Sequence, residues 1–256
     1  MAGILDSFKL DGKVALVTGC ERGLGQGMSI ALAEAGADVF GVSYPADADE
    51  TKARVEKLGR KFAYMQANLM SIEPIPAIFQ KAVAAFGHVD IVVNNAGIIK
   101  RNDSVDFTEA EWDDVMNINL KTVFFMCQAA AKQYIAQKTG GKIVNVASML
   151  SFQGGIRVPS YTASKSGVKG ITMLMANEWA KHGINTNAIA PGYMATDNTA
   201  PLRADAERSA TILERIPAAR WGEPRDLAGT VVFLASAASD YINGYTVAVD
   251  GGWLAR

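Results

Sequence analysis

The stretch VALVTGCERGLGQGMSIALAEAG, residues 14–36, decides how this chain folds. It opens with a short apolar run, passes through a turn with three glycines, and ends in a helical period closed by Gly36. Strand, glycine turn and helix in this order are typical of the first unit of a nucleotide-binding α/β domain. The turn is spaced G-x-x-x-G-x-G and not G-x-G-x-x-G. By itself it therefore indicates only a backbone that can approach a phosphate closely.

The alternation of apolar runs and helical periods continues along the whole chain. Strands are predicted at 13–19, 37–43, 61–67, 89–95, 141–148, 184–190 and 245–250. Helices are predicted at 23–36, 48–59, 72–86, 108–138, 160–181 and 225–236. This pattern predicts a single doubly wound (Rossmann) α/β domain over residues 1–256, with a seven-stranded parallel sheet flanked by helices.

The segment 196–224 breaks this alternation, because it carries helix-forming residues and no strand. It follows the carboxyl end of a predicted strand, which is the edge of such sheets where ligands bind. We therefore favour a mobile lid, while an ordinary surface excursion remains the alternative.

Composition excludes several classes of protein. The 256 residues include 25 basic and 26 acidic side chains, so no basic field attracts nucleic acid. We expect no membrane span and no signal peptide, since no long apolar run occurs. Two cysteines and two histidines in separate contexts predict neither a disulfide scaffold nor a metal site. The expectation is a reduced, cytoplasmic protein.

The end of the second predicted strand leaves the choice of nucleotide open. An acidic residue at this position binds the ribose of NAD, whereas a nearby Arg accepts the 2′-phosphate of NADP. Ser43 stands where the acid is expected, and Arg22 in the glycine turn could reach a phosphate. At the end of the fourth strand, residues 94–97 (NNAG) are polar or small, and we expect all four at the cofactor edge.

Tyr161 and Lys165 are spaced to meet on one face of a helix. An ammonium about 5 Å from a phenol lowers its pKa by roughly two units at an effective dielectric near 20, which suits proton exchange with an alcohol. Ser148 ends a strand thirteen residues earlier, at the same sheet edge. A second Y-x-x-x-K pair, Tyr134 and Lys138, has no such neighbour, and we interpret it as a solvated helix face.

Taken together, these motifs resemble the short-chain dehydrogenase/reductase family over essentially the whole chain. The resemblance rests on TGxxxGxG at 18–25, NNAG at 94–97, Ser148, the Tyr161–Lys165 pair and NAIAPGYMAT at 187–196, in that order. It implies an NAD-dependent oxidoreductase, with NADP possible.

The resemblance also implies a role for each member of the predicted catalytic set. Tyr161 would be the general acid and base, and Lys165 would lower its pKa and hold a ribose. Ser148 would orient the substrate oxygen, and Asn119 would bend its helix and support a proton-relay water. Many family members carry Asp where this chain has Asn68. The predicted cofactor-binding residues are Gly19, Arg22, Gly23, Leu24, Gly25, Ser43, Asn68, Leu69, Asn95, Ala96, Gly97, Tyr161, Lys165, Pro191, Gly192 and Thr196.

A finer resemblance, in stretches such as ASMLSFQGGIRVPSYTASKSGV and YTVAVDGGWLAR, points to a subgroup of sugar-acid dehydrogenases. Its members transfer hydride at carbon 5 of a 2-dehydro-3-deoxy sugar acid during pectin breakdown. Such a substrate carries a carboxylate, which favours a cationic partner. The predicted substrate-binding residues are Ser148, Met149, Gln153, Arg157, Tyr161 and Arg101.

Three alternatives remain open from the sequence. Gluconate 5-dehydrogenases and β-ketoacyl carrier-protein reductases that use NADP(H) share the same catalytic residues, and Arg22 favours the latter. A dinucleotide-binding sensor would have no need of the catalytic set. The resemblance further implies a homotetramer, with the C-terminal DGGWLAR joining subunits.

Overall fold

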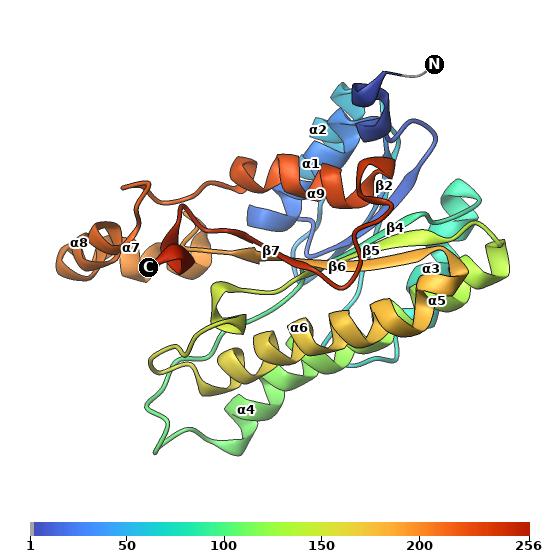
Figure 1. Ribbon diagram of the computed structural model, residues 1–256. Coiled ribbons are helices and arrows are strands. Elements are labelled where there is room, and N and C mark those ends of the chain that lie inside the picture. Colours follow the sequence, from blue (N-terminus) through green and yellow to red (C-terminus); the bar gives the residue numbers. More distant parts are fainter. Residues whose placement is uncertain (1–2) are drawn as a thin grey trace.

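The computed structural model describes residues 3–256, so residues 1–2 of the predicted domain lie outside the described residues. Seven parallel strands form one sheet in the order β3-β2-β1-β4-β5-β6-β7 (Figure 1). The strands are β1 (Val14–Thr18), β2 (Asp38–Ser43), β3 (Phe62–Gln66), β4 (Ile91–Asn94), β5 (Gly141–Val146), β6 (Ile184–Pro191) and β7 (Thr246–Val249). The predicted single domain with a seven-stranded parallel sheet is confirmed, and each strand lies within or one residue beyond its predicted range.

Helices cover both faces of the sheet (Figure 1). One layer contains α1, α2 and α9, which pack on a core that includes Met28, Val55 and Leu234. The other contains α3, α5 and α6, with Ile78 and Met126 in its core. The helices are α1 (Gly23–Glu34), α2 (Asp49–Lys57), α3 (Ile75–Phe86), α4 (Glu109–Met116), α5 (Thr122–Gln137), α6 (Pro159–Trp179), α7 (Ala200–Ala204), α8 (Ala206–Arg215) and α9 (Ala228–Ala235).

The helix predicted at 108–138 is interrupted. α4 and α5 are separated by a π-helical turn, Asn117–Lys121, which widens the helix around Asn119. Thr108 begins α4 with a capping box, in which its hydroxyl accepts from the Glu111 backbone and the Glu111 carboxylate accepts in return. The π-helical turn therefore contains Asn119, the residue for which the family resemblance implies a bend in the helix.

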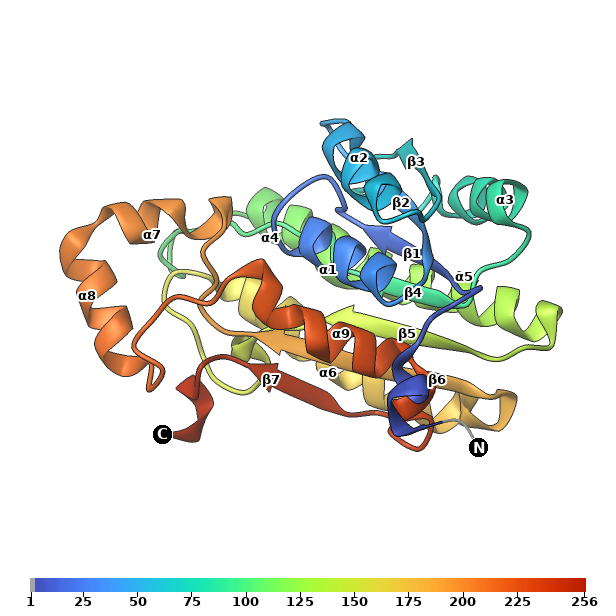
Figure 2. The same ribbon diagram turned by 90° about the horizontal axis from the view of Figure 1, so that it is seen from above.

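The excursion at 196–224 forms two short helices, α7 and α8, which project past the carboxyl ends of the strands (Figure 2). The C-terminus lies on the same side (Figure 2). Trp253 from the C-terminal tail is buried with Met149, Ile212 and Ile216. The last residues of the chain thus hold α8 against the loop that follows β5.

Tyr134 corrects one interpretation of the sequence. Its side chain is fully buried in the core and donates to the Lys142 carbonyl at 3.1 Å, so this Tyr does not lie on a solvated helix face. Its hydroxyl has an internal partner, which is what burial of a Tyr requires. The neighbouring Lys138 ends α5 in the left-handed region, at φ 59°. Within residues 3–256, no helix combines the length and the apolar character needed to cross a membrane.

Candidate active site

A cavity of about 440 Å³ opens at the edge where the carboxyl ends of β1, β2, β4 and β5 meet. This is the edge at which doubly wound sheets bind their ligands. The walls contain Glu21, Tyr44, Asp197 and Asn198, which the sequence did not single out. They also contain the predicted residues Gly19, Arg22, Gly23, Leu24, Ser43, Asn68, Leu69, Asn95, Ala96, Gly97, Tyr161, Lys165 and Thr196.

Three of the predicted cofactor residues stand behind this wall. A Cβ at Gly25 would overlap the Gly19 carbonyl oxygen, so Gly25 allows the turn to fold over the start of α1. Pro191 ends β6 inside the sheet, and a Cβ at Gly192 would meet Asp250 Cα at 2.6 Å. Gly192 therefore packs against the end of β7 and does not face the cavity.

The glycine turn is tied to the end of β4 by two side chains. Gly19 and Gly23 adopt positive φ angles of 66° and 56°, which L side chains rarely tolerate. Asn95 donates from Nδ2 to the carbonyls of Thr18 and Gly19, at 2.9 and 3.1 Å. The Thr18 hydroxyl accepts from the backbone N–H groups of Asn95 and Ala96, both at 3.0 Å. Thr18 and Asn95 therefore hold the floor of the cavity in place.

Asn94 does not belong to the cofactor edge, contrary to the sequence-based expectation. Its side chain is buried and donates to Asn145 Oδ1 at 2.9 Å and to Cys127 Sγ at 3.2 Å. Asn145 in turn donates to the Thr172 hydroxyl at 3.0 Å. Because side chains alternate along a strand, Asn94 points into the layer between the sheet and α5 and α6. Only Asn95, Ala96 and Gly97 of the NNAG motif reach the cavity.

The donor set of the cavity fits a dinucleotide. Among the residues that line the cavity, two have a buried side-chain oxygen without a hydrogen-bond partner in the described part of the protein: Glu21 Oε2 and Ser43 Oγ. Buried polar atoms nearly always have partners, so these two suit a polar ligand. The glycine turn opens α1, whose first N–H groups are available to a phosphate. Arg22, Asn68 and Thr196 would lie along such a ligand in the cavity wall.

Tyr161 and Lys165 both reach this cavity from the first turns of α6. Lys165 is almost completely buried, and its Nζ donates to the Val146 carbonyl at 2.6 Å. The same Nζ lies 5.6 Å from the centroid of the Tyr161 ring. Ser148 follows β5, and its hydroxyl is near enough to the Tyr161 phenol to lower the pKa of that group. The structure brings these three side chains together.

Burial governs the ionisation of this group. The pKa of Tyr161 is raised by burial, with the Ser148 hydrogen bond and the charge of Arg101 opposing the shift. Burial also lowers the pKa of Lys165, to about 8. In the protein without ligand, the net shift of the phenol pKa is therefore upward and not the downward shift expected from Lys165. Removing a phenol and an ammonium from water disfavours both charged forms.

Asn119 lies behind this group and is fully buried. Its side-chain amide pairs with the backbone of Ile98, accepting at 2.9 Å and donating at 2.8 Å. It also donates to the Ser164 hydroxyl at 3.4 Å. Asn119 thus connects the loop after β4 to α6, the helix that carries Tyr161 and Lys165.

The two candidate arginines for a substrate carboxylate differ in their surroundings. Arg101 donates to the Asn198 carbonyl at 3.0 Å, and its charge acts on the Tyr161 phenol. Arg157 forms an ion pair with Asp103 at 2.9 Å on the exposed loop before α6. Arg101 therefore contacts Asn198 of the cavity wall without lining the cavity itself, whereas the guanidinium of Arg157 already has a carboxylate partner.

The other two predicted substrate residues lie under α8. Met149 is buried among Ile212, Ile216 and Trp253. Gln153 accepts from Arg215 at 3.4 Å. Neither residue lines the cavity itself, so both belong to the packing between the loop after β5 and α8.

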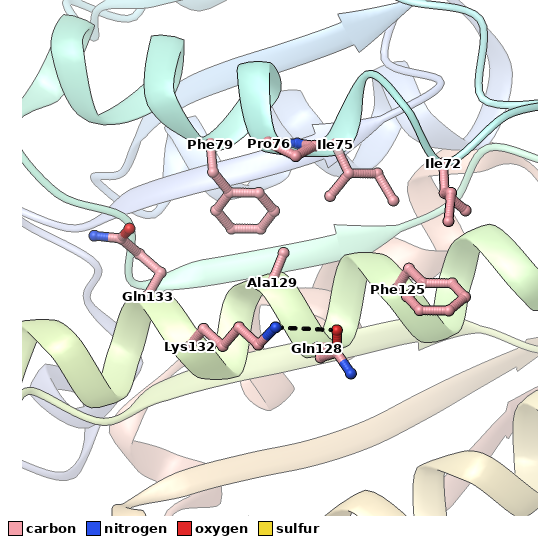
Figure 3. A pocket seen from close by; sticks show the side chains of 9 residues that line it. All are labelled: Ile72, Ile75, Pro76, Phe79, Phe125, Gln128, Ala129, Lys132 and Gln133. Atoms are coloured by element: carbon pink, nitrogen blue, oxygen red, sulfur yellow. Dashed lines mark hydrogen bonds between the residues drawn. The ribbon is translucent and has the colours of Figure 1, made fainter.

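A second hollow, of about 410 Å³, lies between α3 and α5 (Figure 3). Ile75, Phe79 and Phe125 point into it, and Lys132 donates to Gln128 at its rim (Figure 3). This lining offers no paired acid and base for chemistry. Within residues 3–256, no group of three or more His, Cys, Asp or Glu side chains is placed to hold a metal ion.

Sequence reasoning missed Thr18, Glu21 and Asp197. Thr18 and Glu21 stand in or beside the glycine turn, where any polar side chain is a candidate for the ligand. Asp197 forms an ion pair with Arg22 at 2.7 Å, although 175 residues separate the two. No local signal predicts a pair of that kind.

Comparisons with known proteins agree with this geometry. Residues 19–254 match a family described as enoyl-(acyl carrier protein) reductase. The 2-dehydro-3-deoxy-D-gluconate 5-dehydrogenase of Escherichia coli (strain K12) is 67% identical over 253 residues, which cover 99% of this chain and 100% of that protein.

Solved structures of similar proteins share the fold. A protein from Agrobacterium tumefaciens with bound NADP is 53% identical, with a TM-score of 0.92 over 98% of this chain and 99% of that one. A gluconate 5-dehydrogenase from Burkholderia cenocepacia, in complex with NADP and tartrate, is 37% identical, with a TM-score of 0.93 over 99% and 100%. With its fold, its motifs and these matches over nearly its whole length, the chain belongs to the short-chain dehydrogenase/reductase family.

Proposed function

We propose that this protein is a nicotinamide-dependent 2-dehydro-3-deoxy-D-gluconate 5-dehydrogenase, which interconverts an alcohol and a ketone at carbon 5 of that sugar acid. Its similarity over the full length to the Escherichia coli enzyme supports this substrate. The observation that carries the proposal is the cavity that joins the glycine turn to Tyr161 and Lys165. A bound nicotinamide dinucleotide supplies or accepts the hydride.

In this proposal Tyr161 exchanges the proton of the reacting oxygen. Burial raises the pKa of the phenol, so it is protonated at neutral pH and can donate to a ketone oxygen during reduction. In the opposite direction, the Ser148 hydrogen bond and the charge of Arg101 stabilise the phenolate that must accept the proton. Lys165, held on the Val146 carbonyl, would stand beside the phenol and the ribose.

Arg101 is our candidate for the carboxylate of the substrate. A guanidinium can hold a carboxylate through two parallel hydrogen bonds. Arg101 donates to the carbonyl of Asn198, a residue of the cavity wall, and its charge lowers the pKa of the Tyr161 phenol. Asn119 would keep the loop before Arg101 in register with α6, through its two hydrogen bonds to Ile98.

The test is a spectrophotometric assay of the purified protein with 2-dehydro-3-deoxy-D-gluconate, D-gluconate and a β-ketoacyl thioester, each with NAD(H) and NADP(H). We expect the highest kcat/KM with the first substrate. Tyr161→Phe should reduce kcat by at least about a hundredfold, the usual range for a lost general acid, while dinucleotide binding persists. Turnover of the thioester alone would favour a carrier-protein reductase, and the absence of any turnover would favour a sensor.

We further propose that the protein is a cytoplasmic homotetramer. Exposed apolar side chains support an assembly, among them Met173, Leu174 and Tyr245 near the free edge of the sheet at β7. The apolar hollow between α3 and α5 is a second such surface (Figure 3). Light scattering during size-exclusion chromatography measures the mass, and a monomer would contradict the proposal.

A further inference from the structure

We infer that Glu21, together with Ser43, binds the hydroxyl groups of the adenosine ribose and thereby selects NAD(H) over NADP(H). This inference rests on the proposed function as a nicotinamide-dependent enzyme. The sequence analysis did not single out Glu21, and it left the choice between NAD and NADP open at Ser43 and Arg22.

Glu21 is held beside the end of β2 by the backbone. The N–H groups of Gly19 and Cys20 both donate to the Val42 carbonyl, at 2.7 and 3.3 Å. These bonds bring the glycine turn against the last residue of β2, Ser43. Glu21 and Ser43 therefore line the same cavity although they come from different segments. A carboxylate thus reaches the place where an acid at the end of the second strand would bind a ribose hydroxyl.

Each of these two side chains has one buried oxygen without a partner in the described part of the protein. Glu21 Oε2 and Ser43 Oγ are buried, and neither finds a hydrogen-bond partner among residues 3–256. Burial raises the pKa of Glu21, and the backbone hydrogen bonds and the charge of Arg22 offset this only in part. Hydroxyl donors from a ribose would satisfy the carboxylate and stabilise its charged form.

The same carboxylate opposes a 2′-phosphate. Such a group carries about two negative charges at neutral pH, so it would be repelled by Glu21 and would leave no hydroxyl to donate. Glu21 is partly buried, which strengthens the repulsion relative to a pair in open solvent.

Arg22 is the cation that could offset the repulsion between Glu21 and a 2′-phosphate, but it already has another partner. Its guanidinium donates to Asp197 at 2.7 Å, and both side chains are more than half exposed. Exposed ion pairs are weak and are screened by salt. Arg22 can therefore reduce the penalty on NADP(H) without reversing it. The partly buried carboxylate of Glu21, with Oε2 unpartnered, outweighs the exposed guanidinium of Arg22, which is paired with Asp197.

The experiment measures binding of NADH and NADPH to the full-length protein by isothermal titration calorimetry, without any sugar substrate. Wild type should bind NADH at least tenfold more tightly. Glu21→Gln, which keeps the shape and removes the charge, should lower this ratio at least tenfold. Asp197→Asn frees Arg22 and should tighten NADPH binding alone. Glu50→Gln is the matched control, because it removes the same charge from an exposed residue of α2 that pairs with Arg54.

Two results would overturn the inference. One is a wild-type protein that prefers NADPH, and the other is a Glu21→Gln variant with the wild-type ratio and a normal melting temperature. If neither dinucleotide binds to wild type, the proposed function fails together with this inference. If both bind and only the ratio fails to change, the proposed function stands and the role of Glu21 is wrong.

Discussion

The hydroxyl of Ser151 joins the backbones of two residues in the candidate catalytic set. It donates to the Lys165 carbonyl at 2.6 Å and accepts from the Ser148 N–H at 3.3 Å. The loop after β5 and the first turns of α6 are thereby held at a defined separation. Because proton transfer depends on small distances between donor and acceptor, Ser151 is a positioning residue for Ser148 and Tyr161.

Ser151→Ala should lower kcat by about fivefold to tenfold, as expected for one lost hydrogen bond of about 1 kcal/mol, with dinucleotide affinity unchanged. Ser151→Thr keeps the hydroxyl and should restore most of the activity. Ser166→Ala is the control, since Ser166 donates to the Leu150 carbonyl at 3.4 Å between the same two segments. Equal losses of kcat in Ser151→Ala and Ser166→Ala would contradict a positioning role for the Ser151 hydroxyl. They would mean that any hydrogen bond between these two segments contributes in the same way.

The thiol of Cys20 is expected to make the free energy of unfolding depend on pH in the alkaline range. Burial, helped by the nearby charge of Glu21, raises the pKa of the thiol from 9.0 to about 12. Below pH 9 the thiol is protonated in the folded and the unfolded chain alike. Between pH 9 and 12 only the unfolded chain loses the proton, so the free energy of unfolding falls as the pH rises. The loss approaches about 1.4 kcal/mol per pH unit.

We therefore expect the free energy of unfolding of Cys20→Ala to fall less steeply than that of wild type between pH 9 and 10.5. Urea denaturation in the presence of a reductant measures both slopes. The buried thiol of Cys127 is also shifted to about 12, but it is present in both proteins and cancels in the difference. Parallel slopes would mean that the Cys20 thiol titrates normally.

At the scale of the element, the glycine turn and α1 form one unit. A methyl group at Gly25 would overlap the Gly19 carbonyl oxygen and would approach Asn95 Nδ2 to 2.5 Å. These two atoms form the hydrogen bond that ties the glycine turn to the residue after β4, from Asn95 Nδ2 to the Gly19 carbonyl. The element therefore has no room to adjust without moving the floor of the cavity.

Gly25→Ala should lower the free energy of unfolding by about 1–3 kcal/mol, the usual cost of overpacking, and should weaken dinucleotide binding. Gly170→Ala in α6 is the matched control, because its added Cβ meets no atom within 4 Å outside its own helix in the described part of the chain. That change should stabilise the protein by about 0.5–1 kcal/mol, as in other exposed helix interiors. Thermal unfolding compares the two variants, and equal effects would contradict this reading of the turn.

At the scale of the whole molecule, the C-terminal tail connects segments that are far apart in sequence. Trp253 is 4% exposed and packs on Met149 and Ile212. The Arg215 guanidinium stacks 4.0 Å from the Trp253 ring. Arg256 donates to the carbonyls at the end of α8. The position of α8 against the loop after β5 thus depends on the last four residues of the chain.

Trp253→Ala should cost about 3–5 kcal/mol, as for other buried tryptophans. The loss should be concentrated at α8, so KM for the sugar acid rises more than KM for the dinucleotide, and limited proteolysis cuts first between α7 and α8. Trp112→Ala provides the control, since Trp112 is 40% exposed on α4. An unchanged KM for the sugar acid in a folded Trp253→Ala protein would separate the tail from the site.

Much of the fold was predictable because secondary structure depends mainly on residues that are close together in the sequence. Apolar runs and helical periods identify each strand and most helices from neighbouring residues alone, and their alternation implies a parallel sheet. The carboxyl ends of parallel strands meet at one edge, so the turn at Gly19, the NNAG motif and Tyr161 could be assigned to one site in advance. The break of the long helix at Asn119 was suggested only by the family resemblance.

The sequence by itself determined the elements, their order in a doubly wound sheet, and the residues gathered at its carboxyl edge. Only the tertiary structure decided that Tyr134 is buried, that Asn94 points away from the cofactor edge, and that Arg157 pairs with Asp103. It also decided the ionisation of Tyr161 and Lys165 and the place of Glu21 beside Ser43. The reason is physical: periodicity depends on neighbours along the chain, whereas solvation, charge pairing and hydrogen-bond partners depend on groups that folding brings from distant segments.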